Sequence, residues 1–330
     1  MERTRERAIA SVRDLLERAG FFVSDAHGLR PTSFDLAARR DSLLLLIKVL
    51  KNIDTLSREE ADRLGELARL FPALALVIGE TSGTSRLEAG VVYSRYDLPI
   101  LAPTTFEDLI QKGIPPFLVS APGGIFARMD GPRLRALREA RGLSLGAMAK
   151  IAGVSRHSIQ LYEEGGGAEV IVVERVEQFF DESLALPVDL LSIGVAVRGP
   201  EPPAGRRDGA RPSAWESDPL RAGVYEHLFG MGWEVVPTAR APFDAFTRTP
   251  PETREREILL TAIGSLRTAQ HRAEFLAHLA RVIEQHAMFI VPDPAPRAAI
   301  DGLPILSVEE LARHRDRDEL MESIEEREEA

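Results

Sequence analysis

Five neighbouring side chains between positions 155 and 160 have the chemistry needed to bind a nucleic acid. Arg156 has a guanidinium that can donate two hydrogen bonds to guanine, and the amide of Gln160 can pair in the same way with adenine. Ser155 and Ser158 have hydroxyls that suit phosphate oxygens, and His157 lies between them. Residues 156, 157 and 160 share one side of an α-helix. The pattern therefore predicts a helix whose exposed side reads DNA bases.

The apolar residues around this segment predict how the helix is held. Residues 145–152 have helical spacing, Gly153 interrupts it, and the spacing resumes as far as Tyr162. Gly153 can adopt a positive φ after a short helix, and Ser155 is a good N-cap for the next one. We therefore predict a helix-turn-helix in which Ser144 caps the first helix. The residues expected to face inward include Ala149, Ile159 and Tyr162.

The charge around this segment differs from that of the whole chain. The 330 residues carry a formal net charge of −10 at pH 7, whereas residues 133–164 hold six basic and three acidic side chains. A basic island in an acidic protein is typical of a localised phosphate-binding surface. We expect Arg133 and Lys150 to bind phosphates without regard to base sequence. The alternative is a helix pair that never touches DNA, with its polar side chains merely solvated.

The segment LSLGAMAKIAGVSRHSIQLYEEG, with the arginine-rich helix before it, resembles the DNA-binding domain of the Cro/repressor (XRE) family. In this resemblance residues 144–152 form the second helix and residues 155–162 the recognition helix. The family often has glutamine at the start of the second helix, where this chain has Leu145 and Gly146. The DNA-binding residues that we predict are Ser144, Ser155, Arg156, His157, Ser158, Gln160, Arg133 and Lys150.

The first 121 residues alternate helix and strand. A helical stripe from residue 9 to residue 19 ends at Gly20, and residues 34–38 and 43–50 predict a hairpin with a turn at 39–42. Further along we expect a helix at 58–70, a strand at 74–78, short strands near 91–93 and 100, and a helix at 104–110. This alternation is typical of an α/β layer structure.

The order of these elements resembles the restriction-endonuclease-like (PD-(D/E)XK) fold, in the version used by Holliday-junction resolvases. That family binds a divalent metal with an Asp and a Glu, and a Lys stands two residues beyond the Glu. Asp35 and Lys48 match the pattern, but Leu46 stands where the Glu belongs. One carboxylate is too little to hold magnesium. We expect no catalytic residue, with Asp35 and Lys48 left as a buried ion pair; a carboxylate such as Glu6 completing the site is the alternative.

Residues 224–263 echo residues 12–50, which indicates an internal repeat. In that register Asp244 corresponds to Asp35, Thr261 falls near Lys48, and both copies later contain the segment LPIL. The second copy therefore lacks the lysine and is a degenerate α/β repeat. Chance similarity between two α/β stretches is the alternative.

Other chemistries find little support in the sequence. The chain has no cysteine, and its seven histidines include no HxxxH or HExxH pair, so we expect no metal site. No phosphate-binding loop of the GxxxxGK[ST] type and no nucleophile motif of the GxSxG type occurs, so we expect no cofactor and no enzymatic activity. We read the triple glycine at 165–167 as a helix cap and a flexible turn. Without a signal peptide or membrane segment, the protein is expected to be cytoplasmic.

The whole layout resembles a group of archaeal helix-turn-helix transcriptional regulators. The resemblance implies sequence-specific binding of double-stranded DNA; a resolvase-type nuclease and a protein interaction module are the alternatives. Because one helix reads few bases, we expect a homodimer on an inverted repeat, assembled mainly through the α/β domains. The alternative is that the two α/β copies pair with each other within one chain, as a pseudo-dimer. The predicted parts are an inactive nuclease-like α/β domain (1–121), a Cro/repressor-type domain (122–192), a flexible linker (193–217) and the second α/β domain (218–330).

Overall fold

The computed structural model describes residues 2–25, 33–190, 218–238, 241–250, 257–295 and 297–328. The predicted linker at 193–217 lies outside the described residues. The chain forms two compact units. The first unit comprises Met1–Leu15, Val49–Arg58 and Ala75–Val197; the second comprises Leu16–Lys48, Glu59–Leu74 and Arg198–Ala330.

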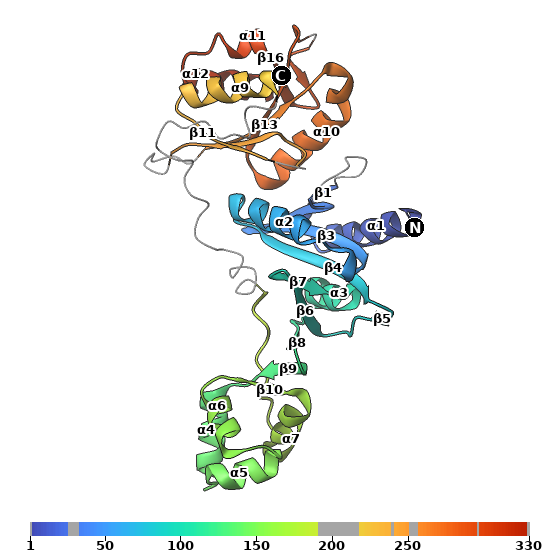
Figure 1. The fold of residues 1–330 in the computed structure, drawn as a ribbon, viewed down its shortest axis with the longest axis vertical. Helices are drawn as coiled ribbons and strands as arrows, with labels where there is room; N and C mark the ends of the chain where they lie inside the picture. The colour runs from blue at the N-terminus through green and yellow to red at the C-terminus, as the bar shows by residue number, and fades with distance from the viewer. Residues whose placement is uncertain are drawn as a thin grey trace. The chain divides into compact units, whose positions relative to one another are not determined.

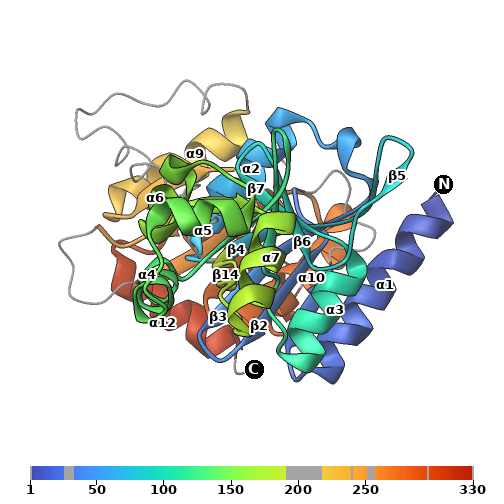
Figure 2. The same ribbon diagram turned by 90° about the horizontal axis from the view of Figure 1, so that it is seen from below.

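The first unit joins part of an α/β layer to a group of helices. Its strands run in the order β4-β7-β6-β8-β9-β10, and helices α5 and α6 lie side by side (Figures 1 and 2). The unit contains most of helix α1 (Glu2–Arg18) and the 3₁₀ helix η1 (Ile53–Thr55). Its strands are β4 (Leu74–Ser82), β5 (Ser85–Arg86), β6 (Val91–Arg95), β7 (Leu98–Leu101), β8 (Leu118–Ala121), β9 (Gly124–Arg128) and β10 (Gly167–Glu169), and its other helices are α3 (Pro103–Lys112), α4 (Gly131–Ala140), α5 (Leu145–Ala152), α6 (Arg156–Glu163) and α7 (Val170–Phe180).

The second unit holds the remaining elements of both α/β copies. From the first copy come strands β1 (Phe22–Asp25) and β2 (Leu36–Arg40), most of β3 (Leu43–Asn52), and helix α2 (Arg58–Leu70). The second copy has helices α9 (Pro219–Gly230), α10 (Leu266–Ile283), α11 (Val308–Leu311) and α12 (Arg317–Glu328), and strands β11 (Glu234–Pro237), β12 (Ala245–Arg248), β13 (Ile258–Ile263), β14 (His286–Val291), β15 (Ala299–Ile300) and β16 (Leu303–Ser307).

The helix at 58–70 and the strands beginning at Leu74 and Val91 occur where the sequence predicts them. The first hairpin differs in its turn. The ladder of β2 and β3 extends to the pair Arg40 and Leu43, so the turn is shorter than the predicted 39–42. Asp41 adopts φ 52°, a left-handed conformation that aspartate tolerates and that tight hairpins require. The first strand is therefore shifted toward the turn, to Leu36–Arg40, and the second extends beyond residue 50 to Asn52.

The two α/β copies share one strand arrangement. The ladder β1-β2-β3 is antiparallel, as is β11-β12-β13. In each copy a later strand runs parallel to its neighbour, β4 with β7 and β14 with β16, and an antiparallel partner follows, β6 or β15. The opening helix of each copy is followed by a left-handed glycine, Gly20 at φ 81° and Gly232 at φ 91°. This shared topology supports the predicted repeat.

The LPIL segments also occupy equivalent places. Each follows a two-residue hairpin turn in which both residues have positive φ. The turn is Tyr96 and Asp97 in the first copy, at 51° and 64°, and Asp301 and Gly302 in the second, at 50° and 79°. Such turns match the twist of the strands that they join. Buried β7 and β16 thereby take corresponding positions in the two sheets.

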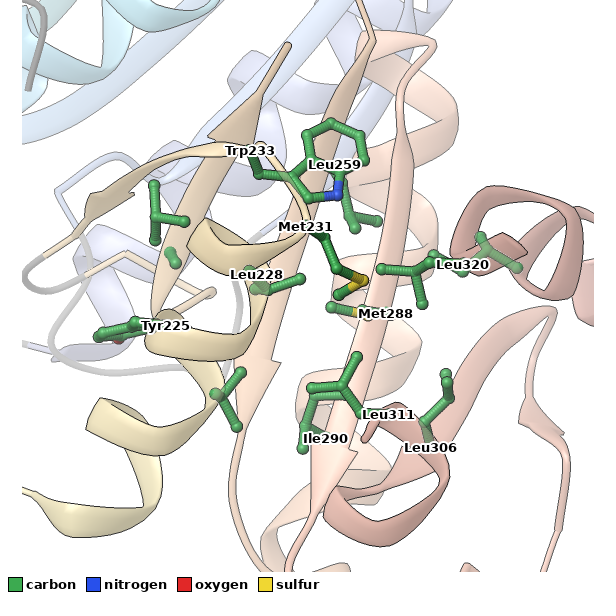
Figure 3. Packing of buried hydrophobic residues seen from close by; sticks show 14 of the residues in the cluster. Tyr225, Leu228, Met231, Trp233, Leu259, Met288, Ile290, Leu306, Leu311 and Leu320 are labelled. Carbon is green, nitrogen blue, oxygen red and sulfur yellow. The ribbon is translucent and has the colours of Figure 1, made fainter. Parts of the chain in front are cut away.

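A continuous apolar core closes one face of the second copy's sheet (Figure 3). Side chains alternate across a strand, so Leu259 and Ile263 of β13 join this core while Leu260 turns to the opposite face. On that opposite face Arg272 of α10 lies 5.7 Å from the ring centre of Phe289. The core includes Tyr225, Leu228, Met231, Trp233, Met288, Ile290, Leu306, Leu311 and Leu320.

None of the helices within the described residues has both the length and the apolar character that spanning a membrane requires.

A histidine fastens the last helix to this sheet and makes a pH-dependent contribution to stability. His286 Nδ1 lies 3.0 Å from Glu328 Oε2. The hydrogen bond to Glu328 raises the pKa of His286 above 6.5, against the opposing effect of burial. The pKa of His286 is higher in the folded protein than in the unfolded chain. The stabilisation from this contact is therefore fully present below the pKa of the unfolded chain, and it is lost as pH rises through the pKa of the folded protein.

We therefore expect the urea midpoint of unfolding of the native protein to fall relative to that of His286→Gln as pH rises from the unfolded pKa of His286 through its folded pKa. Urea unfolding across a pH series measures the difference between the two proteins. His278→Gln, a change at an exposed position of α10, serves as the control and should track the native protein. A native profile parallel to that of His286→Gln at every pH would contradict the expectation.

Candidate nucleic-acid interface

Helices α5 and α6 form the predicted helix-turn-helix. Gly153 ends α5 at φ 74°. The hydroxyl of Ser144 accepts the Ala147 N–H at 3.1 Å, and that of Ser155 accepts the Ser158 N–H at 3.0 Å. Both serines are thus N-caps, as the sequence indicates. Each cap fixes the residue at which its helix begins, and with it the side of the helix that faces outward.

The inner sides of these helices are held by a compact core. Ile159 and Met148 are fully buried, Ala149 is nearly so, and Tyr162 packs partly buried against them. The small Ala149 permits the close crossing that the sequence predicts. Helices α4 and α7 complete the core with Leu134, Val172, Val173, Val176 and Phe180.

The outward side of α6 presents the side chains predicted to meet DNA. Arg156, His157 and Gln160 are exposed, and Gln160 Nε2 donates to Glu164 Oε1 at 3.2 Å. Ser155 is exposed and Ser158 half-buried, with 2.8 Å between their hydroxyl oxygens. The structure therefore brings all five together at the start and along one side of α6.

Gly146 explains how Arg156 lies. A Cβ at Gly146 would lie 3.6 Å from Cδ of Arg156, so the stem of the arginine crosses the first turn of α5. This is the region where the Cro/repressor family often has glutamine and where this chain departs from the pattern. The sequence signalled the departure, but the contact that replaces it appears only in the structure.

Most of the predicted basic island is engaged within the domain. Among the described residues, Lys150 and Arg156 are the two members that make neither an ion pair nor a side-chain hydrogen bond, and both are exposed. The exposed positive charge without a partner is thus concentrated on α5 and α6. The engaged members are Arg133 with Glu182 (Nε–Oε2 2.9 Å), Arg135 with Glu139 (3.1 Å), Arg138 with Glu163, and Arg141 with the carbonyl of Phe179 (2.9 Å).

A buried ion pair braces the end of α6. Arg138 donates from Nε to Glu163 Oε1 at 2.5 Å and from Nη2 to Oε2 at 3.0 Å, and its Nη1 donates to the Leu143 carbonyl at 3.0 Å. The two side chains are 10% and 8% exposed. The hydrogen bond that Arg138 donates to Glu163 raises the pKa of Arg138, against the opposing effect of burial. Sequence reasoning counted Arg138 as a surface cation and missed this role, because nothing local marks its partner 25 residues away.

The start of α4 touches the same point. A Cβ on Gly131 would lie 2.4 Å from the Glu163 carbonyl oxygen, so only glycine permits this approach of the two backbones. Helix α4 therefore holds the last turn of α6 at two places, through Gly131 and through Arg138.

The triple glycine after α6 is only partly a turn. Gly165 adopts φ 89°, as expected of a residue that reverses the chain after a helix. Gly167, however, begins strand β10 and pairs with Arg128 of β9. The predicted flexible turn is thus wrong at this residue, because cross-strand pairing with a distant segment is not visible in local composition. The end of α6 is connected to the ladder of β8 and β9 within a few residues.

In the first α/β copy, Asp35 and Lys48 form the predicted ion pair. Asp35 Oδ1 lies 3.9 Å from Lys48 Nζ, with both side chains buried. Leu46 is fully buried, so hydrocarbon occupies the place of the second carboxylate. Among the described residues, which include Glu6, no group of three or more His, Asp or Glu side chains is placed to hold a metal ion.

The strand ladders fix how the second copy aligns with the first. Asp35 N–H donates to the Ile47 carbonyl and Asp244 N–H to the Thr261 carbonyl, both at 2.8 Å. Thr261 therefore corresponds to Ile47. Thr261 thus lies next to the position of Lys48, near which the sequence places it, and the buried Ala262 stands at that position itself.

Two arginines neutralise the remaining carboxylate of the second copy. Arg221 Nη2 lies 2.8 Å from Asp244 Oδ1, and Arg272 Nη2 donates to Oδ2 at 2.9 Å. Oδ2 also accepts the Ile263 N–H at 2.7 Å. Guanidinium groups thus satisfy the carboxylate that would bind a metal in an active nuclease, and no sequence pattern indicated either arginine.

The fold and these positions define the class: a protein that combines nuclease-like α/β architecture with a helix-turn-helix domain. A model of the PD-(D/E)XK superfamily domain matches residues 5–116, and a model of a helix-turn-helix domain matches residues 131–181. No solved structure matches the chain.

Archaeal relatives match almost the whole chain. A protein of Natronomonas pharaonis is 37% identical over 98% of this chain and 99% of its own length. One of Halorubrum lacusprofundi is 36% identical over 98% of each, and one of Archaeoglobus fulgidus 34% identical over 92% of each. All three are provisionally named HTH-type transcriptional regulatory proteins. The chain belongs to this family.

The contribution of the buried pair of Arg138 and Glu163 can be compared with that of an exposed pair whose arginine also lies on α4. Arg138→Ala leaves Glu163 buried without its partner and should destabilise the helix-turn-helix domain by about 3–5 kcal/mol. Arg135→Ala breaks the exposed pair with Glu139 and should cost less than about 1 kcal/mol. Urea unfolding monitored by circular dichroism compares the two variants, and equal losses would refute the structural role of Arg138.

Proposed function

We propose that the chain is a sequence-specific DNA-binding transcriptional regulator that reads DNA with the outward side of α6. The observation that carries this proposal is the exposed set Arg156, His157 and Gln160 on a helix fixed at both ends. The names of the archaeal relatives support the regulatory role.

Base reading would use the two side chains with paired hydrogen-bonding groups. Arg156 is held across Gly146, which reduces the conformational freedom that it would lose on binding guanine. Gln160 would exchange its bond to Glu164 for adenine. That bond is exposed, so breaking it costs little. His157 lies between these two on the same outward side.

Phosphate binding would use the starts of α5 and α6. Ser144 and Ser155 lie at the N-termini, where unpaired backbone N–H groups and the helix dipole favour anions. Lys150 adds a free positive charge on α5. Arg133 is already paired with Glu182, so we expect a smaller contribution from it than from Lys150.

The α/β copies would then serve as a scaffold without catalysis. We propose the four-part division at residues 121, 192 and 217, with the helix-turn-helix domain between two degenerate nuclease-like domains. Buried Leu46 and the arginines around Asp244 support this view. A DNA-binding role implies a cytoplasmic location.

Two-fold assembly would give the protein its selectivity. A single recognition helix reads roughly 3–4 bases, too few to select one site in a genome. The described residues contain one helix-turn-helix, so the second reading head must come from another chain. We therefore propose a homodimer on an inverted repeat whose half-sites lie about one helical turn apart.

Selection from random double-stranded DNA at low salt tests the site and the assembly together. The enriched sequence should be an inverted repeat. Arg156→Ala or Gln160→Ala should weaken binding to it by about 1–3 kcal/mol and relax preference at one base of each half-site. Lys150→Ala should instead weaken all DNA alike and lower the salt dependence by about one counterion for each phosphate that is no longer bound.

Arg135→Ala serves as the control, because its charge is already paired on the surface with Glu139. A single enriched half-site would disprove the dimer and leave base reading intact. Enrichment of no sequence, with a second protein co-purifying, would instead support an interaction module.

The match to the PD-(D/E)XK superfamily favours a nuclease as the second candidate. We expect no cleavage of branched or linear DNA in magnesium or manganese, because Leu46 leaves Asp35 as a lone carboxylate paired with Lys48. Gel analysis of such incubations checks this expectation. Cleavage by the native protein that Asp35→Ala abolishes would overturn it.

A further inference from the structure

Five buried phenylalanines form an aromatic seam between the two α/β copies within the second unit. Phe34 of the first copy lies 6.5 Å from Phe275 of α10, measured between ring centres. Phe71, directly after α2, meets Phe243 at 5.9 Å and Phe246 at 5.4 Å, both edge to face. Each ring is at most 7% exposed. The seam therefore belongs to the interior of the unit.

The contacts on the two sides of the seam correspond in part. Phe34 and Phe243 are equivalent, because each stands directly before the aspartate of its copy. Phe34 packs on α10, while Phe243 packs on the residue that follows α2, the helix equivalent to α10. The same position of each copy thus packs on or beside the corresponding helix of the other, at different points along it, which gives an approximate two-fold relation between the copies.

A polar contact borders the seam. Arg39 of β2 forms an ion pair with Glu284, at 2.5 Å, and donates from Nη1 to the Ile283 carbonyl at 3.3 Å. Glu284 and Ile283 lie at the C-terminal end of α10, where a cation is favoured by the helix dipole. Helix α10 also packs along strands β1 and β2. The interface thus has an apolar centre and a charged edge, as protein interfaces generally do.

We infer that the second α/β copy is a built-in partner of the first, so that two nuclease-like domains pair as a pseudo-dimer within one chain. The second copy is retained for its surface, which agrees with a site whose carboxylate is neutralised by Arg221 and Arg272. The seam faces are covered in cis. These faces are therefore not available to join two chains, and a homodimer would make its contacts through other surfaces.

The absence of cysteine from the chain permits a direct test. The side chains of Arg39 and Glu284 are 24% and 66% exposed, so cysteines at these positions can be reached by a reagent. The full-length double variant Arg39→Cys, Glu284→Cys is treated with a short bismaleimide. We expect most of the product to be a cross-linked monomer, identified by a peptide pair joining positions 39 and 284. A mixture of the two single variants should give less than about a tenth as much cross-link.

Arg39→Cys combined with Glu309→Cys is the matched control. Glu309 is also exposed in the second copy, but it lies on α11, which contacts the sheet face opposite α10, so no cross-link should form. Cross-linked dimers from the mixed single variants would show pairing in trans and overturn the inference, as would a double variant in which positions 39 and 284 do not react together. Neither readout depends on DNA, so the result is separable from the proposed function.

Discussion

The buried ion pair of Arg138 and Glu163 is the contact on which the orientation of α6 depends. It joins α4 to the last turn of α6, at the point where Gly131 lets the two backbones meet. Two charges buried together are stable only while both are present and hydrogen-bonded, so this contact admits one arrangement of the helices. The Ser155 cap fixes the other end of α6. With both ends determined, the outward direction of the side chains between them is determined as well.

The α/β copies show two ways in which a nuclease-like fold can satisfy a buried carboxylate with positive charge from its own side chains. In the first copy Lys48 satisfies the remaining Asp35, and a buried leucine fills the place of the missing acid. In the second copy, arginines from α9 and α10 surround Asp244. A buried carboxylate without a metal needs another positive charge, and each copy supplies it differently. The fold is kept because its layers still bury apolar surface, including the aromatic seam between the copies.

Much of the fold could be predicted because local sequence patterns determine it. The helix at 58–70, the caps Ser144 and Ser155 and the left-handed Gly153 follow from periodicity and from the conformational preferences of single residues. Strand β10 could not be predicted in this way, since three residues beginning with glycine carry no strand signal until β9 lies beside them. The exact register of the second copy, with Ala262 at the position of Lys48 and Thr261 beside it, also comes from the ladder, because cross-strand pairing sets which residues are opposite.

The sequence by itself determined the kinds of domain, their repetition, the residues on the outward side of α6 and the absence of a second carboxylate beside Asp35. Each of these depends on residue type and short-range spacing. Only the tertiary structure decided which charges are free. It turned Arg138 inward, paired Arg133 with Glu182, left Lys150 and Arg156 exposed and brought two arginines to Asp244. The physical reason is that the burial and partner of a charge depend on segments tens of residues apart, whose approach is fixed by packing.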